Sequence, residues 1–159
     1  MIQATRKTNF NAYIETEAQR IDTTVASTQI RHLVKFINDL DGAVFYAYAR
    51  VETIYDRYTY LEFEYNIVPN RYIGRLDLVP AGYFKYELYE VSWIATVTLS
   101  GLTAPKDENQ VLPVLPNNGV VQGLVAIGKL YLGEGAGAEE VQYTEYEAPA
   151  STNTIYYGQ

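Results

Sequence analysis

The sequence contains no cysteine and only one histidine, His32. Without thiols the chain can form neither a disulfide nor a thiolate metal site, and it has no redox centre or cysteine nucleophile. A single imidazole also excludes a metal site built on two histidines. The residue types therefore describe a domain with little catalytic equipment.

Basic residues and long apolar runs are also scarce. Lys and Arg number 12 against 19 Asp and Glu, so the net charge is −7 and nucleic acid is not an expected partner. No segment approaches the roughly 20 apolar residues of a membrane span. The N-terminal MIQATRKTNFNAYIETEAQ lacks the apolar region of a secretory signal. We expect synthesis in a cytoplasm, without a membrane partner.

Apolar residues and tyrosine are abundant instead. Hydrophobic residues make up 48% of the 159 residues, which excludes wholesale disorder and allows a sizeable core. There are 16 Tyr against 5 Phe and 1 Trp. Tyrosine suits half-buried pleated surfaces, and it is common in contacts between proteins.

Alternating apolar and polar residues predict a series of strands. Residues 43–55 and 58–68 alternate most clearly, with a tight connection between them. A longer pattern over 83–100 changes parity near Tyr89–Glu90, which predicts a β-bulge or a crossing between sheets. Further strands are predicted at 72–78, 120–132 and 141–146, and residues 101–118 are predicted to form a loop.

Residues 28–38 are ambiguous between helix and strand. Apolar residues recur at helical spacing, yet Ile30, Val34 and Phe36 also fit one face of a strand that carries His32. The turn-rich segment 39–42 follows and ends in Asp-Gly. Because this turn would join the segment to the next strand as a hairpin, we favour the strand.

Two carboxylates form the first candidate for chemistry. Glu62 and Glu64 lie on one predicted strand face, roughly 7 Å apart, and paired carboxylates serve glycosidases. Nothing in the sequence suggests a pocket that would raise a pKa, so we interpret both as part of a solvated face. His32 has no accompanying Ser or Asp motif, so we interpret it as structural.

Two loop patterns resemble ligand sites only superficially. Placing Gly42 at the sixth position of a calcium loop puts Ile37 at the first position and Tyr48 at the twelfth, and neither supplies a carboxylate. The glycines of 133–137 lack the Lys and Ser/Thr of a phosphate-binding loop. We therefore predict no catalytic, cofactor-binding or metal-binding residues.

Together these patterns predict one all-β domain, an immunoglobulin-like β-sandwich with extended arms. The segment 78–86 resembles the corner before strand F of such sandwiches, with Tyr83 or Tyr86 as the corner tyrosine. Residues 1–26 are predicted as an N-terminal arm with one short strand around Tyr13–Glu15, 27–146 as the sandwich and 147–159 as a C-terminal tail.

Contacts with other proteins are expected at outward tyrosines and at the chain ends. The ends could add a strand to a neighbour's sheet, although ordinary fraying is the alternative. The predicted contact residues are Tyr46, Tyr48, Tyr58, Tyr60, Tyr156 and Tyr157.

Four segments resemble small β-rich virion structural proteins of tailed bacteriophages: RHLVKFINDLDGAVFYAYA, YDRYTYLEFEY, LVPAGYFKYELYEVSW and GKLYLGEGAGAEEVQYTEYEAPASTNTIYYG. The resemblance implies a non-enzymatic capsid auxiliary or decoration protein that stabilises or bridges neighbouring subunits. Its partners would be the major capsid protein or neck and tail proteins, and it would be present in many copies or as a homo-oligomer. The resemblance also fits a head–tail connector or a tail or baseplate adaptor.

Another class of function is a carbohydrate- or receptor-binding β-sandwich module. Outward aromatic rings beside acids and amides suit sugar stacking. Three or more exposed rings in a groove would favour this class, whereas ordered arms against another protein would favour the virion role. A glycan hydrolase would require Glu62 and Glu64 in a cleft.

Overall fold

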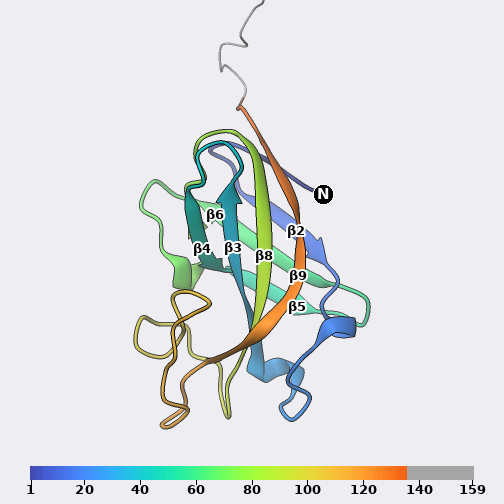
Figure 1. The fold of residues 1–159 in the computed structure, drawn as a ribbon, viewed down its shortest axis with the longest axis vertical. Coiled ribbons are helices and arrows are strands. Elements are labelled where there is room, and N and C mark those ends of the chain that lie inside the picture. The colour runs from blue at the N-terminus through green and yellow to red at the C-terminus, as the bar shows by residue number, and fades with distance from the viewer. Residues whose placement is uncertain (136–159) are drawn as a thin grey trace, which may run out of the picture.

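Two β-sheets stacked face to face form the fold in the computed structural model, which describes residues 1–135 (Figure 1). Helical structure in this part of the chain is limited to short 3-10 turns at Glu17–Gln19, Ser27–Gln29 and Arg71–Ile73. None of its helices is long and apolar enough to cross a membrane. The predicted all-β class, with a sandwich-like arrangement of sheets, is confirmed.

One sheet has five strands and the other has four. The five-stranded sheet has the order β1 (Ile2–Thr5), β9 (Val120–Gly133), β8 (Gly82–Ser92), β3 (Ile30–Asn38) and β4 (Val44–Tyr48). Its neighbours are antiparallel except for β1, which lies parallel to β9. The four-stranded sheet has the order β2 (Phe10–Ile14), β6 (Thr59–Tyr65) and β5 (Val51–Ile54), with the short β7 (Arg75–Leu76) parallel to β6.

The main core lies between the two sheets, where alternate side chains of each strand point inward. Phe36 of β3 and Phe63 of β6 meet edge to face across the interior, with ring centroids 5.6 Å apart. Both rings and that of Phe84 are at most 1% exposed. Burying such side chains stabilises the fold by about 1.5–3 kcal/mol each.

The ambiguous segment 28–38 forms a strand, as favoured from the turn that follows it. β3 pairs with β4 through the turn at 39–42 and with β8 on its other side. Its spacing also fitted a helix because both faces of β3 carry buried residues: Val34 faces the main core, and Leu33 faces the opposite side of the sheet.

The bulge predicted within 83–100 is wrong: the register between β8 and β9 does shift at Leu88/Tyr89 and Glu90/Val91, but the extra residues, Val125 and Gln122, belong to β9, and β8 pairs with β3 without interruption. The parity of the apolar pattern changes because both faces of β8 are buried, with Leu88 on the main core and Val91 on the opposite side of the sheet.

The prediction of one strand over 43–55 is wrong. β4 belongs to the five-stranded sheet and β5 to the four-stranded sheet, so the chain crosses between sheets at 49–50. Alternation continues through the crossing, and a period of two does not show a change of sheet. Gly74 packs against this crossing: a Cβ there would lie 2.2 Å from the Arg50 nitrogen, and its φ is +72°.

The prediction that residues 1–26 form an arm is also wrong, although the short strand predicted around Tyr13–Glu15 overlaps β2. β1 pairs with β9 and β2 pairs with β6, and their inward side chains belong to the main core. Each strand is only four or five residues long, too short for alternation to distinguish it from irregular chain.

Two other predicted strands are shorter in the structure. The strand predicted over 83–100 ends at Ser92, and only Arg75–Leu76 (β7) of the segment 72–78 forms a strand. The predicted strand 141–146 and the tail 147–159 lie outside the described residues.

A buried polar pair links the sheets through the interior. His32 Nδ1 of β3 lies 2.8 Å from Glu52 Oε1 of β5, and the His32 backbone N–H donates to Glu52 Oε2 at 3.1 Å. The two side chains are 2% and 0% exposed. His32, interpreted as structural, therefore satisfies a carboxylate that would otherwise be costly to bury.

We expect Glu52→Ala to lower the free energy of unfolding by about 3 kcal/mol, because it leaves the buried His32 imidazole and backbone N–H without their acceptor. Urea denaturation at neutral pH measures the change. The exposed Glu15→Ala is the control, expected to change stability by less than about 0.5 kcal/mol. Equal stability of the two variants would contradict the role given to the pair.

Candidate interaction surfaces

The β8–β9 loop, residues 93–119, is the most unusual connection in the described chain. It contains the loop predicted at 101–118, and it joins two adjacent antiparallel strands that a two-residue turn could connect. Loops of more than about 12–15 residues are uncommon inside compact domains and are usually functional. The loop, yellow to orange in Figure 1, lies at one end of the sandwich.

Apolar packing holds the loop against the outer face of the five-stranded sheet. Trp93 and Ala104 of the loop form a second buried cluster with Leu33, Tyr48 and Val91 of the sheet, and all five are at most 1% exposed. The loop therefore replaces water on a face that the strands alone would leave exposed.

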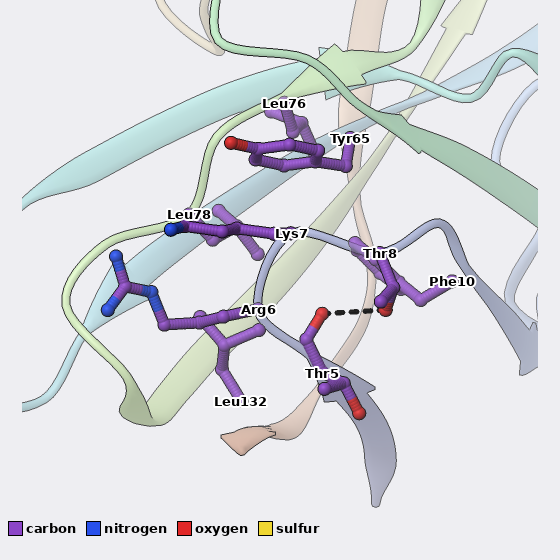
Figure 2. A pocket seen from close by; sticks show the side chains of 9 residues that line it. All are labelled: Thr5, Arg6, Lys7, Thr8, Phe10, Tyr65, Leu76, Leu78 and Leu132. Carbon is purple, nitrogen blue, oxygen red and sulfur yellow. Dashed lines mark hydrogen bonds between the residues drawn. The ribbon is translucent and has the colours of Figure 1, made fainter. Parts of the chain in front are cut away.

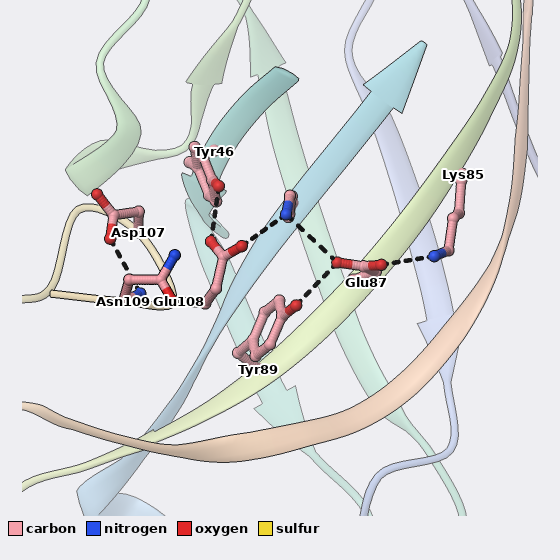
Figure 3. A network of polar contacts seen from close by, with 8 residues as sticks. Tyr46, Lys85, Glu87, Tyr89, Asp107, Glu108 and Asn109 are labelled. Carbon is pink, nitrogen blue, oxygen red and sulfur yellow. Dashed lines mark hydrogen bonds and ion pairs between the residues drawn. The ribbon is translucent and has the colours of Figure 1, made fainter. Parts of the chain in front are cut away.

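A polar network joins the middle of the loop to the same sheet (Figure 3). Glu108 of the loop accepts a hydrogen bond from Lys35 Nζ at 2.5 Å and one from the Tyr46 hydroxyl at 2.6 Å. Lys35 Nζ also lies 3.6 Å from a carboxylate oxygen of Glu87. Glu87 in turn accepts hydrogen bonds from Lys85 at 2.6 Å and from the Tyr89 hydroxyl at 2.8 Å.

The network shifts the pKa values of its members in consistent directions. Burial alone would raise the pKa of Glu108, but hydrogen bonds from Lys35 and Tyr46 hold it below its usual value of 4.5. The hydrogen bond from Lys85 lowers the pKa of Glu87. The bond to Glu108 raises the pKa of Lys35, while burial and a neighbouring carboxylate raise the pKa values of Tyr46 and Tyr89 to about 12. Both carboxylates are therefore ionised near neutral pH.

Hydrogen bonds to the loop backbone add further anchors. The Tyr48 hydroxyl donates to the Pro105 carbonyl at 2.7 Å, and Arg71 donates to the Lys106 carbonyl at 2.7 Å. The Asn117 side chain joins two parts of the loop, because it donates to the Thr96 carbonyl and accepts from a backbone N–H. The loop is thus fixed both to the sheet and to itself.

The anchored loop also carries several exposed apolar side chains. They are Ile94 (49% exposed), Leu102 (85%), Val111 (90%), Val114 (47%) and Leu115 (73%). Scattered exposed apolar residues are normal on protein surfaces, but several on one loop are typical of a contact with another protein. We call these five residues the apolar loop surface.

Two of the predicted contact tyrosines lie under the loop. Tyr48 is 0% exposed, so its prediction as a partner contact is wrong, and Tyr46 is partly buried beside Glu108. Their side chains do point away from the main core, as alternation predicted. The loop covers that face, however, and local alternation carries no information about a segment about 50 residues further along the chain.

Tyr58 and Tyr60 lie on the other sheet, together with two tyrosines that we did not predict as contacts. Tyr13 of β2 lies opposite Tyr60 of β6, with ring centroids 5.3 Å apart. Tyr58 lies 5.5 Å from Tyr13 and 4.9 Å from Tyr55. We call these four residues the tyrosine cluster. Tyr156 and Tyr157 lie outside the described residues.

The carboxylates considered for chemistry lie on the same outer sheet face. Glu62 is 3.6 Å from Arg50, while Glu64 is 3.4 Å from Arg50 and 3.2 Å from Arg75. These partly exposed ion pairs fit the solvated face that the sequence suggested. Pairs of this kind contribute about 0–1 kcal/mol each.

One small pocket opens between the two sheets, near the turn after β1 (Figure 2). Its enclosed space is about 10 Å³, close to the lower limit for a single water molecule. Sites for small ligands usually measure about 300–1,000 Å³. The pocket is lined by Thr5, Arg6, Lys7, Thr8, Phe10, Tyr65, Leu76, Leu78 and Leu132.

Residues 1–135 contain no group of three or more His, Asp or Glu side chains placed to hold a metal ion. Comparisons of the chain with protein-family models, with curated proteins and with solved structures gave no match. The interpretation of function therefore depends on two surfaces of the described chain, the apolar loop surface and the tyrosine cluster.

Protonating the network should weaken the fold in acid. The pKa values of Glu87 and Glu108 are lower in the folded chain than in the unfolded chain. Their ionisation therefore contributes fully to the free energy of unfolding above about pH 4.5, and this contribution is lost as the pH falls through the pKa values of the folded chain. We expect Glu108→Gln to lower the free energy of unfolding by about 1–2 kcal/mol at neutral pH and to flatten its acid dependence. Urea denaturation at neutral pH and at a series of acidic pH values measures both effects, with the substitution Glu15→Gln at an exposed position as the control. An unchanged acid dependence in Glu108→Gln would contradict the role of Glu108.

Proposed function

We propose that the chain is a non-enzymatic structural protein of a bacteriophage virion, most specifically a capsid auxiliary or decoration protein that stabilises or bridges neighbouring subunits. One observation carries the proposal: the apolar loop surface is exposed on a loop fixed by buried packing and charged hydrogen bonds. The resemblance of the sequence to small β-rich virion proteins supplies the class of partner, namely the major capsid protein.

The order of the strands supports an immunoglobulin-like sandwich as the framework for this role. Such domains place strands G, F, C and C′ in one sheet and B, E and D in the other. Reading β9, β8, β3 and β4 as the first set and β2, β6 and β5 as the second reproduces both orders. In this reading the β8–β9 loop is the F–G loop, one of the loops that immunoglobulin domains use for binding.

Exposed apolar side chains favour assembly because association removes them from water. Burying apolar surface contributes about 25 cal/mol per Å² to the free energy of association. Ordering a mobile loop on binding would offset part of this contribution. Here the anchors at Glu108, Tyr48 and Arg71 hold the loop before any partner arrives. A preorganised apolar loop therefore suits a subunit that binds neighbours in many copies.

A head–tail connector or a tail or baseplate adaptor would use the same kind of surface. These roles differ from decoration in the identity of the neighbouring protein and in copy number. Electron microscopy of the intact particle distinguishes them, because density for this chain would lie on the capsid lattice, at the neck or in the tail. A particle that lacks the chain would contradict all three roles.

Polar substitution of the apolar loop surface should prevent incorporation into the particle. We expect the double variant Val111→Asp with Leu115→Asp to be incorporated at least about tenfold less than wild type, because two charges would be desolvated in the contact. Particles assembled with each protein are purified, and the bound chain is quantified. The melting temperature of the free variant should stay close to that of wild type, since both side chains are exposed.

Leu40→Asp is the matched control. Leu40 is 81% exposed and lies in the β3–β4 turn at the opposite end of the sandwich (Figure 1). The Leu40→Asp variant should be incorporated into particles as well as wild type. Equal loss in the control and the double variant would contradict the assignment of the contact to the loop.

A further inference from the structure

We propose that the tyrosine cluster on the four-stranded sheet is a binding site for a neutral glycan. The site lies on a different sheet from the apolar loop surface and goes beyond the structural role proposed above. Its platform consists of Tyr13 on β2, Tyr60 on β6, and Tyr55 and Tyr58 at the turn between β5 and β6.

The backbone holds these rings on one side of the sheet. Tyr13 and Tyr60 are directly opposite each other on antiparallel strands, so their side chains share a face. The Tyr55 N–H donates to the Tyr58 carbonyl at 2.9 Å and closes the turn between them. Neighbouring rings are 4.9–5.5 Å apart and inclined by 40–67°. The cluster is therefore a preformed surface of tilted rings rather than a single flat plane.

The rings are accessible to a ligand. Tyr13 is 62% exposed, Tyr55 49% and Tyr58 38%. Within residues 1–135, only Tyr60 of the four donates its hydroxyl to another side chain, at 3.2 Å from Glu62. The cluster thus offers apolar ring faces beside hydroxyl groups that can donate and accept hydrogen bonds.

The charges around the cluster favour a ligand without net charge. Arg50 lies between Glu62 and Glu64, and Arg75 pairs with Glu64, so these side chains neutralise one another. The turn itself carries one charge of each sign, at Asp56 and Arg57. Exposed Glu15, two residues after Tyr13, adds one negative charge, so the surface is close to neutral and neither an anionic nor a cationic polymer would gain much there.

A sugar chain matches this combination. Each pyranose ring presents apolar C–H groups on its faces and hydroxyls around its edge, which complement an aromatic ring and its polar neighbours. An apolar protein partner would bury tyrosine hydroxyls that need hydrogen-bond partners. A neutral glycan satisfies both the ring faces and the hydroxyls, and its polar edge remains in water.

Titration with neutral oligosaccharides tests the site. The probes are cellohexaose, maltohexaose, xylohexaose and the hexamer of N-acetylglucosamine, each followed by calorimetry and by the NMR signals of the tyrosine rings. We expect saturable binding of at least one probe. Tyr58→Ala and Tyr13→Ala should each weaken it by roughly tenfold, while Tyr58→Phe, which keeps the ring, should weaken it less.

Tyr83→Ala is the matched control and should bind like wild type. Tyr83 is 53% exposed and pairs with Tyr131 at 5.0 Å, but it lies on the five-stranded sheet. Trp93 fluorescence and the melting temperature verify that each variant is folded. If Tyr58→Ala does not fold, the test rests on Tyr13→Ala.

Two results would overturn the proposal. One is the absence of saturable binding of all four probes at millimolar concentration. The other is sedimentation showing a wild-type dimer that Tyr13→Ala dissociates, which would make a second copy the occupant of the cluster. Because the loop variants tested for incorporation leave the tyrosine cluster intact, failure of the glycan site and failure of the structural role are distinguishable.

Discussion

The two central strands, β3 and β8, require cover on both faces, and the rest of the structure depends on how this is supplied. One face of each packs into the core between the sheets. The other carries Leu33 and Val91, which the β8–β9 loop covers together with Tyr72 of the 3-10 turn Arg71–Ile73. A shorter turn between β8 and β9 would leave this second face exposed. The length of the loop is therefore a structural need before it is a functional one.

The same requirement explains why the loop is well positioned for binding. Trp93 fixes its beginning, and Glu108 fixes its middle to Lys35 and Tyr46. Lys35, Glu87 and Glu108 are partly buried, so leaving one of them without its partner would destabilise the loop. Val97 and Leu99 of the loop also pack against this cluster, whereas the five side chains of the apolar loop surface stay exposed. The contacts that anchor the loop to the sheet therefore also hold the apolar loop surface in a fixed position.

The two sheets present different chemistry on their outer faces. The five-stranded sheet is covered by the loop, which presents aliphatic side chains suited to a dry protein contact. The four-stranded sheet presents tyrosines and paired charges suited to a wetter, polar ligand. A subunit built this way can be held to an assembly by one surface and leave the other accessible. This division is compatible with both proposals, the structural role for the loop and the glycan site for the tyrosine cluster.

Local pattern in the sequence determined much of the fold. The strand at 120–132 and the β3–β4 hairpin follow from alternation and turn residues, which act over a few neighbours. The composition likewise excluded cysteine chemistry. Only the tertiary structure decided that β4 and β5 belong to different sheets, that Tyr48 is buried, and that Tyr13 joins Tyr58 and Tyr60. These outcomes depend on contacts between segments far apart in the chain, and a period of two residues records the face of a strand but not what covers that face.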